Sequence, residues 1–126
     1  MFRYTYNPLV YGHEPIEKGI DRLARFGYDG VELIGEPAEM DGSAIRDELQ
    51  RHGTRASSII SIFTPERDIV SSDPAIRRAA IEYVRGNVDL AADLGADIVT
   101  FTPTACMKIA PEADLSDEWA WAVAAA

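Results

Sequence analysis

One carboxylate lies inside a run of apolar residues. Glu32 stands in the middle of the segment "GVELIG", residues 30–35, which otherwise has the composition of a buried strand. A buried carboxylate without a partner costs several kcal/mol. We therefore predict that Glu32 either faces solvent or meets a partner, such as a basic side chain, a hydroxyl group, water or a bound polar ligand.

Few other residues have the type and spacing of a catalytic or metal site. His13 is interpreted either as an acid, base or hydroxyl-binding group, or as an exposed loop residue that precedes a helix. Cys106 has no histidine in a recognisable arrangement with it, which favours a small apolar residue over a nucleophile. The sequence contains no HxxxH, CxxC or HxxE pattern, so no metal ligands are predicted within it.

The elements that must position these side chains follow from the spacing of apolar residues. Alternating aromatic and polar residues indicate the first strand, and β-branched runs indicate later ones. Helices are expected to begin at capping residues or prolines and to end at glycines. The predicted strands cover residues 2–6, 31–34, 56–63 and 97–102. The predicted helices start at residues 15, 41, 74 and 116, with Ser116 as the cap of the last, and the first three end at Gly27, Gly53 and Gly95.

One junction recurs three times along the chain. In "FGYDGVEL", "HGTRASSI" and "LGADIVTF" a helix ends at glycine and a strand begins two or three residues later. Such short loops are typical of repeated βα units, whose right-handed crossovers produce a parallel sheet. No GxGxxG or GxxxxGK segment follows the first strand, which argues against a nucleotide-binding fold. The prediction is an α/β fold of four strands and four helices, half of a TIM barrel, since eight units need about 250 residues.

Composition argues against several classes of partner. The 126 residues suit one domain or part of a larger one, and the net charge of −9 disfavours nucleic acid and acidic membrane surfaces. The single cysteine forbids an internal disulfide. We find neither a signal peptide nor an apolar run of about 18 residues or more, and we therefore expect a soluble, cytoplasmic protein without membrane partners.

Two longer segments resemble a known family. "RFGYDGVELIG" and "SSDPAIRRAAIEYVRGNVDLAADLGADIVTF", with the order of units, are similar to the sugar phosphate isomerase/epimerase family of xylose isomerase-like TIM barrels. This family includes ketose 3-epimerases and inosose dehydratase-like lyases. The resemblance covers residues 2 to about 123 and corresponds to the N-terminal half of the barrel. It implies that residues 1–126 form the first half of a (β/α)8 barrel domain, truncated in the fourth helix.

The resemblance also implies where the catalytic machinery lies. In the family, a divalent metal is held by Glu, Asp, His and Glu from strands five to eight, and the acid/base carboxylates are among these ligands. We therefore expect Mn²⁺ or Mg²⁺ in the complete barrel, with no catalytic residue and no metal ligand in this chain. Several epimerases of the family carry a histidine at the end of strand three. This chain has "SIFTPE" there, a departure that argues against the epimerase subclass and leaves a lyase or an isomerase open.

Barrel enzymes bind their substrates at the carboxyl ends of the strands. A sugar needs hydroxyl, amide and carboxylate partners together with an apolar or aromatic face. Tyr6 and Phe63 could supply the face, and Asn7, Thr102 and Thr104 could bind hydroxyl groups. The predicted substrate-binding residues are Tyr6, Asn7, His13, Glu32, Glu36, Ser61, Phe63, Thr102 and Thr104.

The barrel hypothesis assigns a direction to each side chain around Glu32. Val31 and Leu33 should point outward under the helices, whereas Glu32 and Ile34 should point into the lumen. Glu32 is then either a structural hydrogen-bonding hub or a direct contact of the substrate. A Glu32 that faces the helices or bulk solvent would contradict this register.

The predicted function is that of a metal-dependent, sugar-active isomerase or epimerase that abstracts a proton next to a carbonyl and forms an enediolate. The 126 residues alone are expected to be inactive. Alternatives are a lyase of the same family, of the dehydratase or the C-glycoside-cleaving type, and a non-catalytic α/β interaction module. The expected partners are a small carbohydrate and either the remaining half of the barrel or a second chain, in an enzyme that we expect to be a homo-oligomer.

Overall fold

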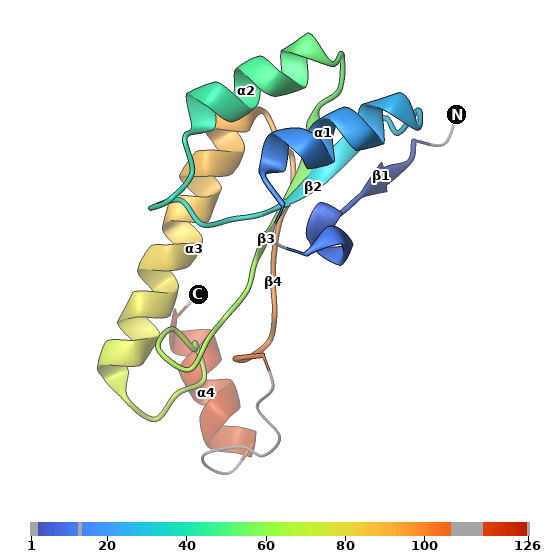
Figure 1. Ribbon diagram of the computed structural model, residues 1–126. Coiled ribbons are helices and arrows are strands. Elements are labelled where there is room, and N and C mark those ends of the chain that lie inside the picture. The colour runs from blue at the N-terminus through green and yellow to red at the C-terminus, as the bar shows by residue number, and fades with distance from the viewer. Residues whose placement is uncertain (1–2, 13, 107–114, 126) are drawn as a thin grey trace.

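The computed structural model describes residues 3–12, 14–106 and 115–125. These residues form a parallel four-stranded sheet in the order β1-β2-β3-β4, with helices between the strands (Figure 1). The strands are β1 (Thr5–Tyr6), β2 (Gly30–Ile34), β3 (Ala56–Ser61) and β4 (Val99–Phe101). The helices are η1 (Pro8–Tyr11), α1 (Ile16–Arg25), α2 (Gly42–Arg51), α3 (Pro74–Leu94) and α4 (Leu115–Ala125). The predicted α/β fold of four parallel strands and four α-helices is confirmed.

Several elements differ from the predictions. Within the described residues, β1, β3 and β4 are shorter than the strands predicted at 2–6, 56–63 and 97–102. The short 3-10 helix η1 was not expected; Asn7 begins it, because its side chain accepts a hydrogen bond of 2.9 Å from the backbone N–H of Leu9. Ser116 is not an N-cap, since α4 already begins at Leu115. No helix in the described part of the chain is both long and apolar enough to span a bilayer.

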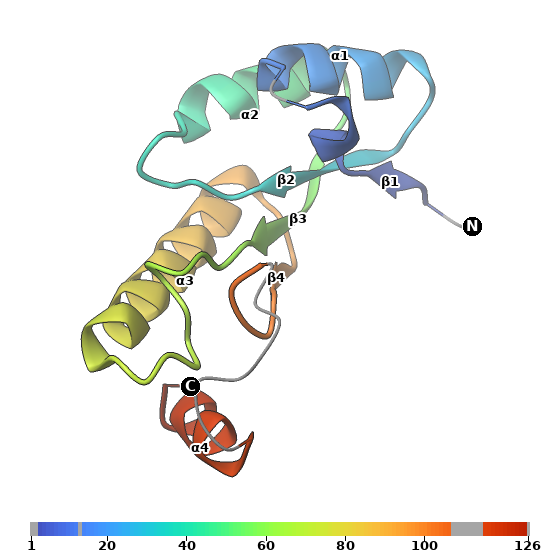
Figure 2. The ribbon, with the colours of Figure 1, turned by 60° about the horizontal axis from the view of Figure 1, so that its bottom comes forward.

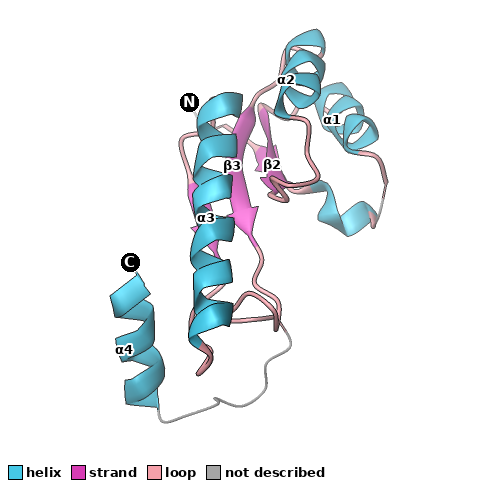
Figure 3. Ribbon diagram, turned by 90° about the vertical axis from the view of Figure 1, so that its left-hand side faces the viewer, coloured by secondary structure: helices cyan, strands magenta, loops and turns pink. Residues whose placement is uncertain are grey.

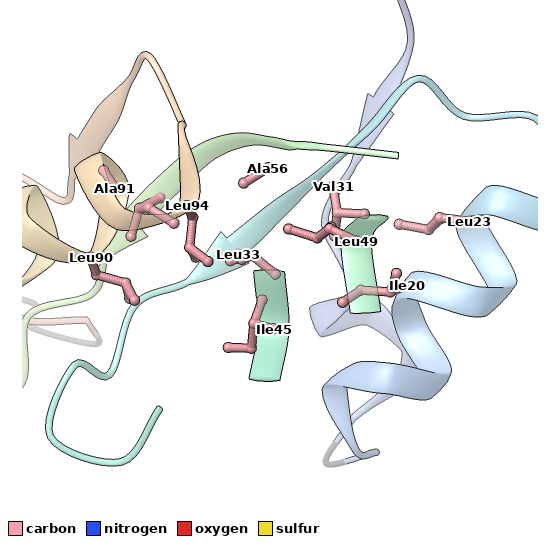
Figure 4. Packing of buried hydrophobic residues seen from close by; sticks show 11 residues of the cluster. Ile20, Leu23, Val31, Leu33, Ile45, Leu49, Ala56, Leu90, Ala91 and Leu94 are labelled. Atoms are coloured by element: carbon pink, nitrogen blue, oxygen red, sulfur yellow. The ribbon is translucent and has the colours of Figure 1, made fainter. Parts of the chain in front are cut away.

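The main core lies between one face of the sheet and helices α1, α2 and α3. Figure 2 shows α1 and α2 side by side over β2, and Figure 3 shows α3 lying along β3. Val31 and Leu33 of β2 are fully buried in this core, as predicted. In Figure 4 they meet side chains from all three helices, namely Ile20, Leu23, Ile45, Leu49, Leu90, Ala91 and Leu94.

A second apolar cluster lies where the segment after β3 meets α3. Phe63 is fully buried there against Ala80 and Tyr83. The ring of Phe63 also packs on Phe101 of β4, with 5.9 Å between ring centres. This cluster connects α3 to the carboxyl ends of β3 and β4, where the segments that follow the strands begin.

Candidate functional site

An open groove of about 650 Å³ lies at the carboxyl ends of β1 and β2. Lining residues from 7–12 and 14–17 form one wall, and those from 36–45 form the other. Its lining residues are Asn7, Pro8, Leu9, Gly12, Glu14, Pro15, Ile16, Glu17, Ile34, Glu36, Glu39, Met40, Asp41, Ala44 and Ile45. The described lining combines apolar side chains with five carboxylates and one amide, and contains no lysine or arginine.

Glu32 connects three strands on the face of the sheet opposite the helices. Its carboxylate accepts a hydrogen bond of 3.1 Å from Nδ2 of Asn7 and one of 2.9 Å from Oγ of Ser58. The same Asn7 caps η1 with its other side-chain atom, Oδ1. Glu32 thus holds Asn7 in the position from which it lines the groove, and the arrangement fits the predicted hydrogen-bonding hub.

Glu36 and Arg67 form an ion pair between the segments that follow β2 and β3. Nη1 of Arg67 donates to Oε2 of Glu36 at 2.9 Å, and Nη2 donates to Oε1 at 2.5 Å. The guanidinium lies over the ring of Tyr83, 3.6 Å from its centre. The hydrogen bonds to Glu36 raise the pKa of Arg67, because they favour the charged guanidinium.

A similar arrangement lies on the opposite wall of the groove. The guanidinium of Arg22 donates two hydrogen bonds to the carboxylate of Glu14 and lies over the ring of Tyr11, 4.1 Å from its centre. This hydrogen bonding lowers the pKa of Glu14, because it favours the charged carboxylate. Each wall therefore presents a carboxylate that is held by an arginine stacked on a tyrosine.

The backbone that precedes Glu36 is fixed from below by α3. The hydroxyl of Tyr83 donates a hydrogen bond of 2.6 Å to the carbonyl of Gly35 and accepts one of 3.1 Å from the N–H of Ile62. Asn87 approaches so closely that a Cβ added to Gly35 would lie 2.0 Å from its Oδ1. Only glycine fits at this point, where the chain leaves β2 and enters the groove wall.

The structure brings three of the predicted site residues together. Asn7 and Glu36 line the groove, and Glu32 lies beneath Asn7. Thr102 and Thr104 lie at the segment after β3: Oγ1 of Thr102 accepts a hydrogen bond of 3.2 Å from the N–H of Phe63, and Oγ1 of Thr104 donates one of 2.8 Å to Asp68. His13 lies outside the described residues.

Three predicted residues lie on the helix side of the sheet rather than in the groove. Tyr6 pairs in register with Val31, and its ring packs on Tyr28 with 5.7 Å between centres. Ser61 is fully buried and accepts a hydrogen bond of 2.9 Å from Asn87 of α3. Phe63 is fully buried in the second cluster. We therefore leave these three side chains out of the candidate groove.

A register shift explains the placement of Ser61. β2 and β3 pair as Val31 with Ala56 and then as Glu32 with Ser58, so that Ser57 is an extra residue in β3. The extra residue reverses the alternation of side chains beyond it. Ser61 consequently points to the same side as the buried Ile59 instead of into the lumen.

Sequence reasoning missed Glu14, Arg67 and Tyr83. None of the three is among the residues predicted to bind substrate. Arg67 and Glu36 are 31 positions apart, so no local spacing could reveal their ion pair. Within the described ranges, no three His, Cys, Asp or Glu side chains gather closely enough to hold a metal ion.

Comparison with known proteins identifies relatives of this fold. The family model described as xylose isomerase-like TIM barrel matches residues 20–126. A ketose 3-epimerase of Arthrobacter globiformis is 31% identical over 84 residues, which are 66% of this chain and 29% of that protein. An L-ribulose 3-epimerase of a Methylomonas species is 33% identical over 79 residues, which are 62% of this chain and 27% of that protein.

A solved structure shows the same arrangement of elements. It is that of a D-allulose 3-epimerase from a Methylomonas species in complex with D-allulose, with a TM-score of 0.87 and 27% sequence identity. The match covers 98% of this chain and 44% of that one. This chain thus spans less than half the length of the structural relative, and its matched segments span less than a third of the two sequence relatives.

Proposed function

Because the chain belongs to the family of xylose isomerase-like TIM barrels, we propose that it is part of an enzyme that epimerises or isomerises a sugar. The proposal rests on the similarity of this chain to ketose 3-epimerases in both sequence and fold. Within the family, the names of these relatives favour epimerisation at C3 of a ketose over the lyase alternative.

The groove suits an uncharged sugar. Asn7 and Glu36 offer an amide and a carboxylate to hydroxyl groups, and Ile34 and Met40 are among the apolar residues that would contact C–H surfaces. Besides the arginine-held Glu14 and Glu36, the carboxylates of Glu17, Glu39 and Asp41 line the groove and would repel a phosphate group. We propose Asn7 and Glu36 as substrate-binding residues, with Glu32 in support; His13, Thr102 and Thr104 remain predicted contacts.

The proposed chemistry is abstraction of a proton next to the carbonyl, which yields an enediolate. A divalent Mn²⁺ or Mg²⁺ ion would supply stabilisation of that anion. The described residues do not fit such an ion, since they contain no suitable cluster of ligands. We therefore assign to this chain the binding and orientation of substrate, and propose that metal ligands and acid/base carboxylates come from the remaining barrel strands.

The sheet edges fit a partner that completes the barrel. Phe101 of β4 and Tyr4 beside β1 are 53% and 66% exposed, at opposite edges of the described sheet. Parallel strands with open edges leave backbone groups without partners, which a closed barrel avoids. We propose that the remaining half of the barrel, or a second chain, covers both edges.

Isotope exchange in D₂O would test the proposed function. The full-length protein is incubated in D₂O with ketopentoses and ketohexoses, with and without Mn²⁺, and the products are followed by NMR. A 3-epimerase would form the C3 epimer and incorporate deuterium at C3. An isomerase would form an aldose with deuterium at C1 or C2. A lyase would instead eliminate water from the sugar.

Each outcome has a distinct meaning. Deuterium at C3 supports the epimerase, and an aldose supports the isomerase. Elimination of water supports the lyase alternative instead. If no ketose exchanges with solvent and no sugar binds, the sugar-active proposal is wrong and the interaction module gains support.

A further inference from the structure

We propose that Arg67 is a positioning residue that, together with Tyr83, fixes the carboxylate of Glu36 as a hydrogen-bond acceptor for a hydroxyl group of the sugar. This inference rests on the proposed function and names the residues that control recognition in the groove. Arg67 itself is not among the residues that line the groove, so it would act through Glu36 and not by contact with the sugar.

Three hydrogen bonds and one aromatic ring hold the guanidinium of Arg67 in place. Two parallel hydrogen bonds connect it to the two oxygens of Glu36. A third, from Nε, reaches the carbonyl of Ile62 at 3.3 Å, and the ring of Tyr83 lies 3.6 Å away on one face. A planar guanidinium held in this way fixes the plane of the carboxylate as well as its position, which a lysine could not do.

Tyr83 fixes both ends of Glu36. Its ring supports the guanidinium that holds the carboxylate, and its hydroxyl donates to the carbonyl of Gly35, the peptide that precedes Glu36. The N–H of Gly35 in turn donates to the carbonyl of Ile60 at 3.0 Å. The backbone and the carboxylate of Glu36 are therefore oriented by one side chain of α3.

Glu36 remains able to accept further hydrogen bonds. Its side chain is 35% exposed and lines the groove, whereas Arg67 is 23% exposed behind it. Each carboxylate oxygen has two lone pairs, and the pair with Arg67 occupies one on each oxygen. A free glutamate would lose rotamer freedom when it binds a sugar; in this arrangement that freedom is already lost on folding.

Steady-state kinetics of the full-length protein on the ketose that it converts would test this inference. We expect Arg67→Met to raise KM about tenfold, the usual effect of losing one charge-assisted hydrogen bond, with kcat changed less than about twofold. The KM of Arg67→Lys should lie between those of the wild type and Arg67→Met. An ammonium group retains the positive charge but cannot donate the two parallel hydrogen bonds of a guanidinium. Glu36→Gln should raise KM similarly, and the double variant should be no worse than Glu36→Gln alone.

Arg46 provides a matched control. Its guanidinium donates two hydrogen bonds, of 2.8 and 2.6 Å, to the carbonyl of Asp93 and does not line the groove. Arg46→Met should lower the melting temperature without a change in KM. If Arg67→Met behaves in the same way, Arg67 is only structural and the inference is wrong. If that variant does not fold, Arg67→Lys decides: an unchanged KM overturns the inference.

Two further outcomes separate this inference from the proposed function. If Arg67→Met raises KM by the same factor in the presence and absence of Glu36→Gln, Arg67 does not act through Glu36 and the inference alone fails. If the wild-type protein neither binds nor converts any ketose, the proposed function fails and the inference fails with it.

Discussion

The hydroxyl of Ser58 donates a hydrogen bond of 2.9 Å to the carboxylate of Glu32 across the neighbouring strands β2 and β3. On its other side, the same carboxylate accepts from Asn7, which follows β1. Val31 and Leu33 meanwhile lie in the apolar core on the opposite face. A strand with a buried face therefore tolerates a carboxylate because two neighbours supply donors.

Replacement of Glu32 by alanine should destabilise the protein by about 1–3 kcal/mol, because two part-buried donors lose their acceptor. Ser58→Ala should cost less, since it removes only one of the two hydrogen bonds. Urea denaturation of both variants would measure the difference. Equal losses for the two variants would show that Asn7 does not depend on Glu32.

Gly35→Ala should be among the more damaging small substitutions. The added Cβ would lie 2.0 Å from Oδ1 of Asn87 and 2.7 Å from Cγ2 of Ile59, so that strand β2 or helix α3 must shift. Overpacking of this kind typically costs about 1–3 kcal/mol. Denaturant midpoints of the variant and the wild type would measure the loss.

Gly42→Ala is the matched control for Gly35→Ala. Gly42 lies in α2, and a Cβ there would come no closer than 3.5 Å to a neighbour, Cδ1 of Leu90. Alanine favours a helix over glycine by up to about 1 kcal/mol, so this variant should be neutral or stabilised. Similar losses at both positions would contradict the importance of the contact with Asn87.

The repeated junctions and the apolar spacing were sufficient to predict the fold. Each αβ loop begins with a glycine that ends the preceding helix. Gly27, Gly53 and Gly95 all adopt positive φ angles of 62–77°. The orientation of Glu32 followed from simple alternation in β2. These features depend on residues close together in the sequence, and such features are readable without a structure.

The candidate site was less predictable, because it depends on contacts between distant segments. The extra residue in β3 placed Ser61 on the helix side, and serines at positions 57, 58 and 61 give no apolar pattern that would reveal the shift. Arg67 in "TPERD" has the composition of an exposed loop, yet it pairs with Glu36 and stacks on Tyr83. Only the packing of α3 against the sheet brings these residues together.

Phe63→Ala should destabilise the protein by about 3–5 kcal/mol. Its side chain is fully buried between Ala80 and Tyr83, and truncation would leave a cavity at the point where α3 meets the sheet. Phe26→Ala serves as the control, because Phe26 is 76% exposed and its truncation should change stability by less than about 0.5 kcal/mol. Thermal and urea unfolding would measure both; a small effect at Phe63 would contradict its placement in the second cluster.

Asp41 should make the stability of the protein depend on pH. Its carboxylate accepts hydrogen bonds from the side chain of Ser43 and from the N–H groups of Ser43 and Ala44, which lowers the pKa of Asp41 below its ordinary value of about 3.9. A lowered pKa stabilises the fold fully above the unfolded value and progressively less as the pH falls through the folded value. Wild-type stability should therefore fall below about pH 4.

Asp41→Asn should be less stable than the wild type at pH 7. The difference should shrink as the pH falls below about 4, because protonation removes the charge of Asp41 in the wild type, whereas the amide of the variant is neutral at every pH. Urea midpoints measured from pH 7 down to pH 3 would show the two curves converging. Asp47→Asn removes the same charge from the middle of α2, away from its N-terminus, and serves as the control for the change in net charge. If the curves of Asp41→Asn and the wild type stay parallel, the cap does not depend on the charge of Asp41.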